Sequence, residues 1–106
     1  MTKRAVVIGA GHYLPERIVE NAEFEGKIDT TDEWIRSRSG IERRHFVGEG
    51  ETTSTMATAA AKAALADAGK TAADVDAVIV ATSTPDLTFP SAATMVQAQL
   101  EMERGF

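Results

Sequence analysis

The sequence contains no cysteine and no long uninterrupted apolar run. Without cysteine, these residues cannot form a disulfide, a thiolate metal site or a cysteine nucleophile. The apolar runs are broken by charged residues, serine or threonine, and Met1 to Arg4 leads directly into a strand-like segment. A membrane span or a secretory leader requires a longer apolar stretch than any present here, so we expect neither.

Positive charge is also scarce, with 11 lysines and arginines against 16 acidic residues and a net charge of -5. This balance argues against general nucleic-acid binding. Four arginines nonetheless occur within nine positions: Arg36, Arg38, Arg43 and Arg44. Such a patch suits an anionic ligand or an acidic protein partner, although a solvated surface paired with carboxylates would explain it equally well.

The glycines near the start form only part of the three-glycine motif of a dinucleotide-binding turn. Gly9-Ala10-Gly11 follows the apolar run Ala5 to Ile8, which is typical of a buried central strand. The third glycine of a dinucleotide-binding turn is replaced by Leu14, and Pro15 falls where the phosphate-binding helix should be running. We therefore exclude that motif and expect the glycines to turn the chain tightly.

The rest of the chain predicts alternating helices and strands. The expected elements are a short helix from Asn21 to about Glu25, a strand or extended arm over 41–47, an alanine-rich helix from Thr53 to Ala68 that stops at Gly69, a capped turn over 71–74, a second buried strand over 77–82, and a helix from Pro90 or Ser91 to about Leu100. Two apolar strands separated by helices predict a parallel crossover and an α/β fold, and 106 residues form one domain at most.

The stretch from Asp29 to Ile41 holds the only tryptophan and reads as a short helix. Thr30 is placed to cap its first turn with Glu33 reaching back, and Gly40 suits a left-handed C-terminal residue. Trp34 and Arg38 are four residues apart, so they project from one face of this helix.

An indole that can stack, beside a guanidinium that can bind phosphate, suits a ligand with a flat base and phosphates, such as a nucleotide or coenzyme A. The alternative is that Trp34 anchors a core and Arg38 is its solvated neighbour. In that case Trp34→Ala would reduce stability instead of affinity.

The loop from Thr82 to Pro90 is rich in turn-forming residues and carries one aromatic residue, Phe89, which we expect to be exposed. Loops at the carboxyl ends of strands are where α/β proteins commonly place their sites. His12 and His45 have no nucleophile near them in sequence, and we interpret both as structural.

Four passages in this order resemble one enzyme family: Gly11 to Pro15, Asp29 to Ile35 with Arg38 to Ile41, Asp76 to Thr82, and Phe89 to Ala93. They are similar to the N-terminal third of the β-ketoacyl-[acyl-carrier-protein] synthase III family, whose members have the thiolase fold. The resemblance implies that residues 1–106 are the N-terminal portion of a thiolase-like condensing-enzyme domain, layered αβαβα when complete. It also implies that the family's nucleophilic cysteine follows shortly after residue 106, and its histidine and asparagine come from the far half of the fold.

The activity implied by the resemblance is that of an acyltransferase of fatty-acid biosynthesis. Acetyl-CoA or another short acyl-CoA acylates the cysteine, and malonyl-acyl carrier protein then loses carbon dioxide and attacks the thioester in a Claisen condensation. The implied assembly is a cytoplasmic homodimer that requires no metal or redox cofactor and binds neither nucleic acid nor membrane.

The resemblance also assigns roles to individual residues. Trp34 would stack on the CoA adenine, Thr30 would hydrogen-bond at the adenine end, and Arg38 would contact the phosphates. Phe89 would reach across the dimer interface and bound the partner's acyl pocket. Glu42 stands where some relatives are basic, which leaves Arg43 and Arg44 for any carrier-protein contact.

Two other functions remain open from the sequence. One is a related thiolase-fold condensing enzyme that makes a polyketide or quinolone precursor from another acyl-CoA. The second is a CoA-binding module without catalytic activity. The residues that follow Phe106 would distinguish them, since a short run leading to a cysteine favours the catalytic reading.

Overall fold

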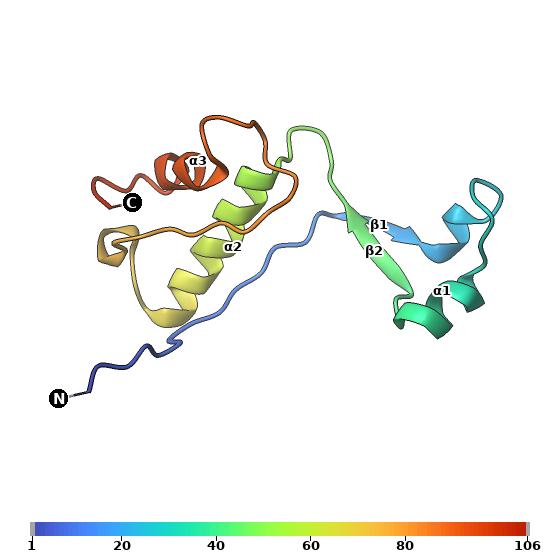
Figure 1. Ribbon diagram of the computed structural model, residues 1–106, viewed down its shortest axis with the longest axis horizontal. Helices are drawn as coiled ribbons and strands as arrows, with labels where there is room; N and C mark the ends of the chain where they lie inside the picture. Colours follow the sequence, from blue (N-terminus) through green and yellow to red (C-terminus); the bar gives the residue numbers. More distant parts are fainter. Residues whose placement is uncertain (1, 106) are drawn as a thin grey trace. The chain divides into compact units, whose positions relative to one another are not determined.

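The computed structural model describes residues 2–105. The elements in chain order are β1 (Arg17–Glu20), the short 3-10 helix η1 (Asn21–Phe24), α1 (Asp32–Ser39), β2 (Arg43–Phe46), α2 (Thr53–Ala68), the 3-10 turn η2 (Ala72–Asp74) and α3 (Ala92–Gln99) (Figure 1). They divide into two compact units, residues 2–13 with 52–105 and residues 14–51. None of the helices formed by residues 2–105 has the length and apolar character needed to span a bilayer.

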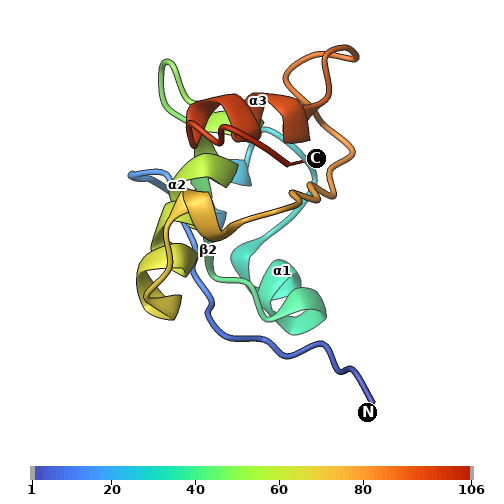
Figure 2. The same ribbon diagram turned by 90° about the vertical axis from the view of Figure 1, so that its left-hand side faces the viewer.

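The first unit is built on α2, whose bounds match the predicted helix. Thr52 caps it by accepting from the Thr55 backbone N–H while the Thr55 hydroxyl accepts from the Thr52 N–H, and Gly69 ends it with a left-handed φ of 65°. Helix α3 packs beside the first half of α2 in both views (Figures 1 and 2) and buries Val96 and Leu100. The core of this unit therefore lies between two helices.

The start of α3 differs from the prediction. Ser91 is its N-cap residue and accepts a hydrogen bond from the Thr94 N–H at 3.2 Å, so the helix begins at Ala92. Pro90 precedes the cap and is not the first helical residue. The capped turn over 71–74 is confirmed, with the Asp74 carboxylate accepting from the Thr71 N–H at 2.9 Å.

The two predicted strands of this unit are not formed. Residues 5–8 and 77–82 do not form β-strands, and Val7 and Ile79 are 90% and 93% exposed. A β-strand is stabilised by ladder hydrogen bonds to a neighbour, and within residues 2–105 neither segment pairs with one. The predictions of buried strands and of a parallel crossover are therefore wrong for this structure.

Residues 8–9 and 77–78 instead border a groove of about 480 Å³ along α2, which is lined by Ala61, Ala64, Leu65 and Ala68. The alanines of α2 let the extended chain approach closely. A Cβ on Gly9 would lie 2.7 Å from the Ala64 carbonyl oxygen, and one on Gly11 would overlap the same turn of the helix. These glycines thus allow backbone contact with α2, whereas the sequence suggested that they form a tight turn.

The second unit, residues 14–51, contains an antiparallel pair of strands. β1 and β2 pair with Arg17 opposite Phe46 and Val19 opposite Arg44, and Val19 is buried. The strand expected within 41–47 is confirmed as β2. The sequence did not predict β1, because Arg-Ile-Val-Glu has too short an apolar alternation to stand out.

Asn21 connects three elements of this unit from a fully buried position. Its amide nitrogen donates to the Ile41 carbonyl at 2.7 Å and to Asp32 Oδ1 at 3.0 Å, and its oxygen accepts from Arg44 Nη2 at 3.4 Å. The prediction that Asn21 caps the following helix is wrong, since Glu20 occupies the cap position of η1. Its side chain turns inward instead, where the amide forms hydrogen bonds with groups of the neighbouring elements.

Candidate functional site

The three predicted ligand-binding residues lie on and next to helix α1: Thr30 precedes its N-cap residue, Trp34 is in its first half and Arg38 is in its last turn. Thr31, and not Thr30, is the N-cap residue, because its hydroxyl accepts from the Trp34 N–H at 3.2 Å. The expected pairing of Thr30 with Glu33 is therefore wrong by one residue. Gly40 ends the helix with a left-handed φ of 73°, as predicted.

Trp34 and Arg38 lie on one face of α1, as their spacing predicted. The Arg38 guanidinium carbon is 5.6 Å from the centroid of the indole ring. Trp34 is 56% exposed, so it does not serve as a core anchor of this unit. An indole with a cation already beside it and an open face is free to stack on a flat ligand.

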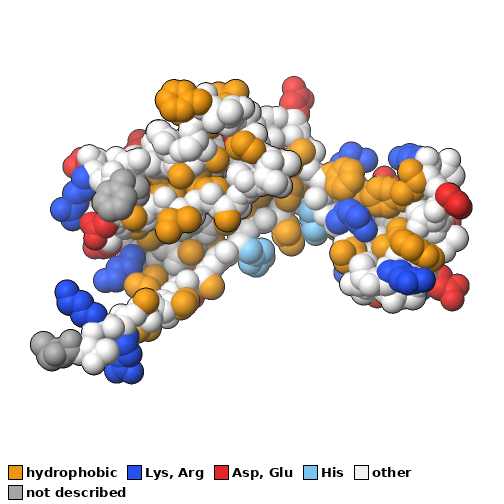
Figure 3. Space-filling model, in the orientation of Figure 1, with side chains coloured by type: hydrophobic (Ala, Val, Ile, Leu, Met, Phe, Trp, Pro, Cys, Tyr) orange, Lys and Arg blue, Asp and Glu red, His pale blue; other side chains and the backbone are white. Residues whose placement is uncertain are grey.

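The indole borders a hollow of about 330 Å³. Its lining combines apolar and basic side chains, namely Phe24, Ile28, Thr30, Trp34, Ile35, Arg38, Ser39, Ile41 and Arg44. Figure 3 shows the same mixture, with blue basic and orange hydrophobic side chains interleaved over this unit in its right-hand part.

Two polar atoms of this lining are buried and have no hydrogen-bond partner within the described residues, Thr30 Oγ1 and Arg44 Nε. A buried polar atom without a partner costs about 1–3 kcal/mol. Because a hydroxyl can both donate and accept, Thr30 can satisfy that need with a polar ligand atom in the hollow. With Thr31 acting as the cap, the Thr30 hydroxyl is left for such a contact.

Chemically, the hollow presents an aromatic face, an exposed guanidinium and an unsatisfied hydroxyl within one small unit. The first suits a planar base, the second a phosphate and the third an exocyclic or ring nitrogen of that base. These are the requirements of a nucleotide-like ligand.

Several relatives of this chain are named β-ketoacyl-[acyl-carrier-protein] synthase III. A β-ketoacyl-[acyl-carrier-protein] synthase III of Ruegeria sp. (strain TM1040) is 77% identical over all 106 residues. No family model matches the chain. The crystal structure of 3-oxoacyl-[acyl-carrier-protein] synthase III from Aquifex aeolicus VF5 superposes with a TM-score of 0.87 at 45% identity and covers 93% of this chain.

The whole chain matches the N-terminal third of β-ketoacyl-[acyl-carrier-protein] synthases III. Its fold is thiolase-like, as the resemblance implied. The chain spans about a third of the length of the relatives it matches, 33% of the Ruegeria protein and 32% of the Aquifex structure. A priming β-ketosynthase of the R1128 polyketide biosynthetic pathway also matches, at 36% identity with a TM-score of 0.87 over 94% of the chain.

The structure places Thr30, Trp34 and Arg38 around one hollow. Phe89 belongs to the other unit, where it is 88% exposed in the loop before α3. The exposure expected for Phe89 is confirmed, and its role in an acyl pocket stays a prediction.

Neither His12 nor His45 lines the hollow. His45 Nδ1 lies at hydrogen-bonding distance, 2.5 Å, from the Pro15 carbonyl oxygen, which supports the structural interpretation of that residue. His12 is exposed. Among residues 2–105, no group of three or more histidines or carboxylates could hold a metal ion.

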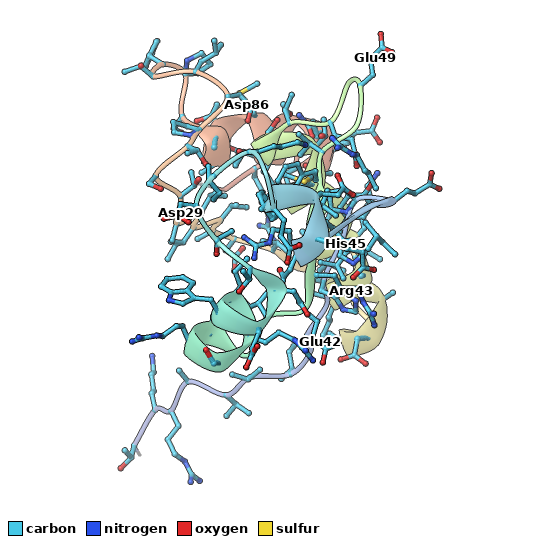
Figure 4. The ribbon with its side chains drawn as sticks, turned by 90° about the vertical axis from the view of Figure 1, so that its right-hand side faces the viewer. Asp29, Glu42, Arg43, His45, Glu49 and Asp86 are labelled. Atoms are coloured by element: carbon cyan, nitrogen blue, oxygen red, sulfur yellow. The ribbon has the colours of Figure 1, made fainter. Side chains whose placement is uncertain are left out.

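The sequence missed Arg44 as part of the site. Its guanidinium lies 5.0 Å from the Phe24 ring centroid and bonds to buried Asn21, so it helps form the wall of the hollow. Arg44 is therefore partly buried in this wall, and its availability for a carrier-protein contact stays a prediction. Arg43 remains exposed at the start of β2, where Figure 4 labels it together with Glu42. The alternation of a strand could have indicated this difference, because neighbouring residues of β2 face opposite sides.

Proposed function

We propose that the full-length protein containing this chain is an acyltransferase that condenses acetyl-CoA, or another short acyl-CoA, with malonyl-acyl carrier protein. This reaction initiates fatty-acid synthesis. The observation that carries the proposal is the exposed Trp34–Arg38 pair at a hollow with an unsatisfied Thr30 hydroxyl. It occurs in a chain that is 77% identical to a protein named for this activity.

In this proposal the segment binds the nucleotide end of CoA. The adenine stacks on the open face of Trp34, and the Thr30 hydroxyl hydrogen-bonds to a nitrogen of the base. Arg38 reaches the phosphates. Its charge is available for this contact, because no carboxylate within the described residues forms a salt bridge to it. Arg36, in contrast, is paired with Asp32 at 3.1 Å and contributes less positive potential.

The condensation chemistry requires residues that this chain does not supply. A cysteine thiolate, stabilised at a helix N-terminus, takes the acyl group, and neutral histidine and asparagine donors stabilise the enolate formed by decarboxylation. This sequence has no cysteine. We propose that the remaining two-thirds of the protein contributes these groups and the strands that pair with residues 5–8 and 77–82.

We also propose that the complete enzyme is a cytoplasmic homodimer without a metal or redox cofactor. Thioester exchange and decarboxylation change no oxidation state, and the thiolate and carbanion arise without an added Lewis acid. Phe89, being exposed, is available to bound the acyl pocket of a second copy.

The direct test uses the purified full-length protein with acetyl-CoA and malonyl-acyl carrier protein. We expect acetoacetyl-acyl carrier protein, carbon dioxide and free CoA in equal amounts, and no product when either substrate is omitted. Formation of CoA without a condensed product would indicate a thioesterase instead and would refute the proposal.

A second candidate function is priming of a polyketide chain, which the match to the R1128 priming β-ketosynthase favours. The two functions differ in the preferred acyl donor. A series of acyl-CoA substrates from acetyl to hexanoyl, each with the same carrier protein, separates them by the ratio of kcat/KM values.

A CoA-binding module without catalytic activity makes a different prediction. Residues 1–106 expressed alone would then form a soluble monomer that unfolds cooperatively. Exposed apolar segments such as 5–8 instead predict aggregation of the isolated chain, because unpaired strand edges associate.

A further inference from the structure

The loop that carries Phe89 is fastened to the N-terminus of α2 by Asp86. The Ser54 backbone N–H donates to Asp86 Oδ1 and the Ser54 hydroxyl donates to Asp86 Oδ2, both at 2.7 Å. A third hydrogen bond joins the Thr53 hydroxyl to the Thr84 carbonyl at 2.6 Å. Asp86 thus caps one of the free N–H groups of α2 from a distant part of the chain.

The Ser54 hydroxyl belongs to a longer hydrogen-bonded chain that reaches α3. Thr58 Oγ1 donates to Gln99 Oε1 at 2.8 Å, and Gln99 Nε2 donates to Ser54 Oγ at 3.0 Å. Ser54 and Thr58 are buried. Every donor in this chain points toward the Asp86 carboxylate, so the carboxylate fixes the direction of the whole network.

The charge of Asp86 is part of this arrangement. The hydrogen bonds from Ser54 hold the pKa of the Asp86 carboxyl below its ordinary value, so it is ionised at neutral pH. An asparagine has the same shape, but one of its oxygens becomes an NH₂ group. That group would face a donor of Ser54, and one of the two bonds would be lost.

Phe89 follows Asp86 by three residues, and Ser91 caps α3 two residues later. The segment 87–90 is therefore held at both ends, while its aromatic side chain is almost fully exposed. Figure 4 shows Asp86 in the loop beside α2 and α3. The anchor therefore restrains the backbone of this short loop, from which the Phe89 ring projects.

We propose that Asp86 is a positioning residue that holds the Phe89 loop and thereby sets the acyl-chain selectivity of the enzyme. The proposal rests on the proposed function, in which Phe89 bounds the acyl pocket. Loss of the anchor lets Phe89 move away from the pocket, so that longer acyl groups fit.

The test compares full-length Asp86→Asn with a matched control, Asp74→Asn. Asp74 also caps a turn of the same unit through a backbone N–H, but it has no bond to the loop 82–90 among the described residues. Two quantities are measured: the ratio of kcat/KM for butyryl-CoA to that for acetyl-CoA, and the hydrogen-exchange rates of the amides of residues 86–89.

For Asp86→Asn we expect the butyryl-to-acetyl ratio to rise about three- to tenfold, within the range by which pocket contacts discriminate methylene groups. The amides of the loop should exchange about fivefold or more faster, as local opening becomes easier. Asp74→Asn should change neither quantity, although both variants lose some thermal stability. Ser54→Ala, which keeps the backbone bond to Asp86, should shift both quantities in the same direction by less.

Equal ratios and equal exchange rates in the two asparagine variants would overturn the proposal. If Asp86→Asn does not fold, Ser54→Ala is compared with Asp74→Asn instead, and equal ratios and equal exchange rates in these two variants would overturn the proposal. If the wild-type enzyme shows no condensation, the proposed function and the selectivity role both fail, whereas faster exchange in Asp86→Asn alone would still establish the anchor.

Discussion

Replacing Trp34 by alanine separates a ligand-binding role from a structural one. The ring is 56% exposed, with Arg38 beside one side. If CoA stacks on its open face, the variant loses binding energy with only a moderate loss of stability. If the ring mainly holds the unit together, the variant loses stability and keeps its affinity for CoA.

The structure gives the size of both effects. Of the up to 250 Å² that a tryptophan can bury, roughly 110 Å² is covered here. At about 25 cal/mol/Å² this area corresponds to at most ~2.8 kcal/mol, and alanine keeps a part of it, so we expect a loss of about 1–2 kcal/mol in unfolding free energy. Stacking of a base on an aromatic ring contributes about 1–3 kcal/mol, which corresponds to a roughly 5- to 150-fold weaker Kd for CoA.

The assay is calorimetric titration of CoA into full-length wild type, Trp34→Ala and Trp34→Phe, with denaturant unfolding of the same samples. Trp34→Phe is the matched control, because it keeps an aromatic face of smaller area. Its Kd should lie between those of the other two proteins.

An unchanged Kd for Trp34→Ala, together with a loss of about 3–5 kcal/mol in unfolding free energy, would refute the reasoning. Losses of that size follow removal of a fully packed aromatic side chain. The exposed indole would then be covered in the complete protein and would have no contact with CoA.

Other residues give further predictions. Arg38→Gln should weaken CoA binding several-fold in titrations at low salt and much less at high salt, because added ions screen an exposed charge; a salt-independent loss would contradict this role. Asn21→Ala should lower the unfolding free energy by about 1–3 kcal/mol in denaturant melts, since Asp32 and the Ile41 carbonyl lose buried partners; a change below ~0.5 kcal/mol would show that water replaces them. The lowered pKa of Asp86 means that its stabilisation is present above about pH 4 and is lost as the pH falls through the still lower folded-state value. The difference in melting temperature between wild type and Asp86→Asn should therefore shrink below pH 4, and a difference constant down to pH 2 would contradict the assignment.

Local sequence signals predicted the helices well. The bounds of α2, its stop at Gly69, the turn at Thr71 and the end of α1 at Gly40 all depend on residues close together in the chain. Capping side chains and left-handed glycines act over a few positions, so their effect can be read without the rest of the fold.

The strands were predicted poorly for the opposite reason. The apolar run 5–8 has the composition of a strand but no partner among residues 2–105, whereas β1 has a weak pattern and a well-formed partner in β2. Pairing is decided by residues distant in sequence, and composition alone does not report it.

The site was predicted in part. The spacing of Trp34 and Arg38 follows from helical geometry, so their shared face was foreseeable. The contributions of Asn21 and Arg44 arise from burial in three dimensions, and the anchoring of the 82–90 loop by Asp86 spans 32 positions of sequence. None of these contacts has a local signature.

The backbone contact of Gly9 and Gly11 with α2 has an evolutionary consequence. Where side chains interdigitate, a change on one surface can be compensated by a change on the other, and homologous proteins drift through such pairs. Here one surface has no side chain to alter, so a larger residue at either glycine meets the helix backbone and no second substitution relieves it. Variation should therefore be close to zero at these two positions while the neighbouring valines and isoleucine exchange freely among β-branched residues.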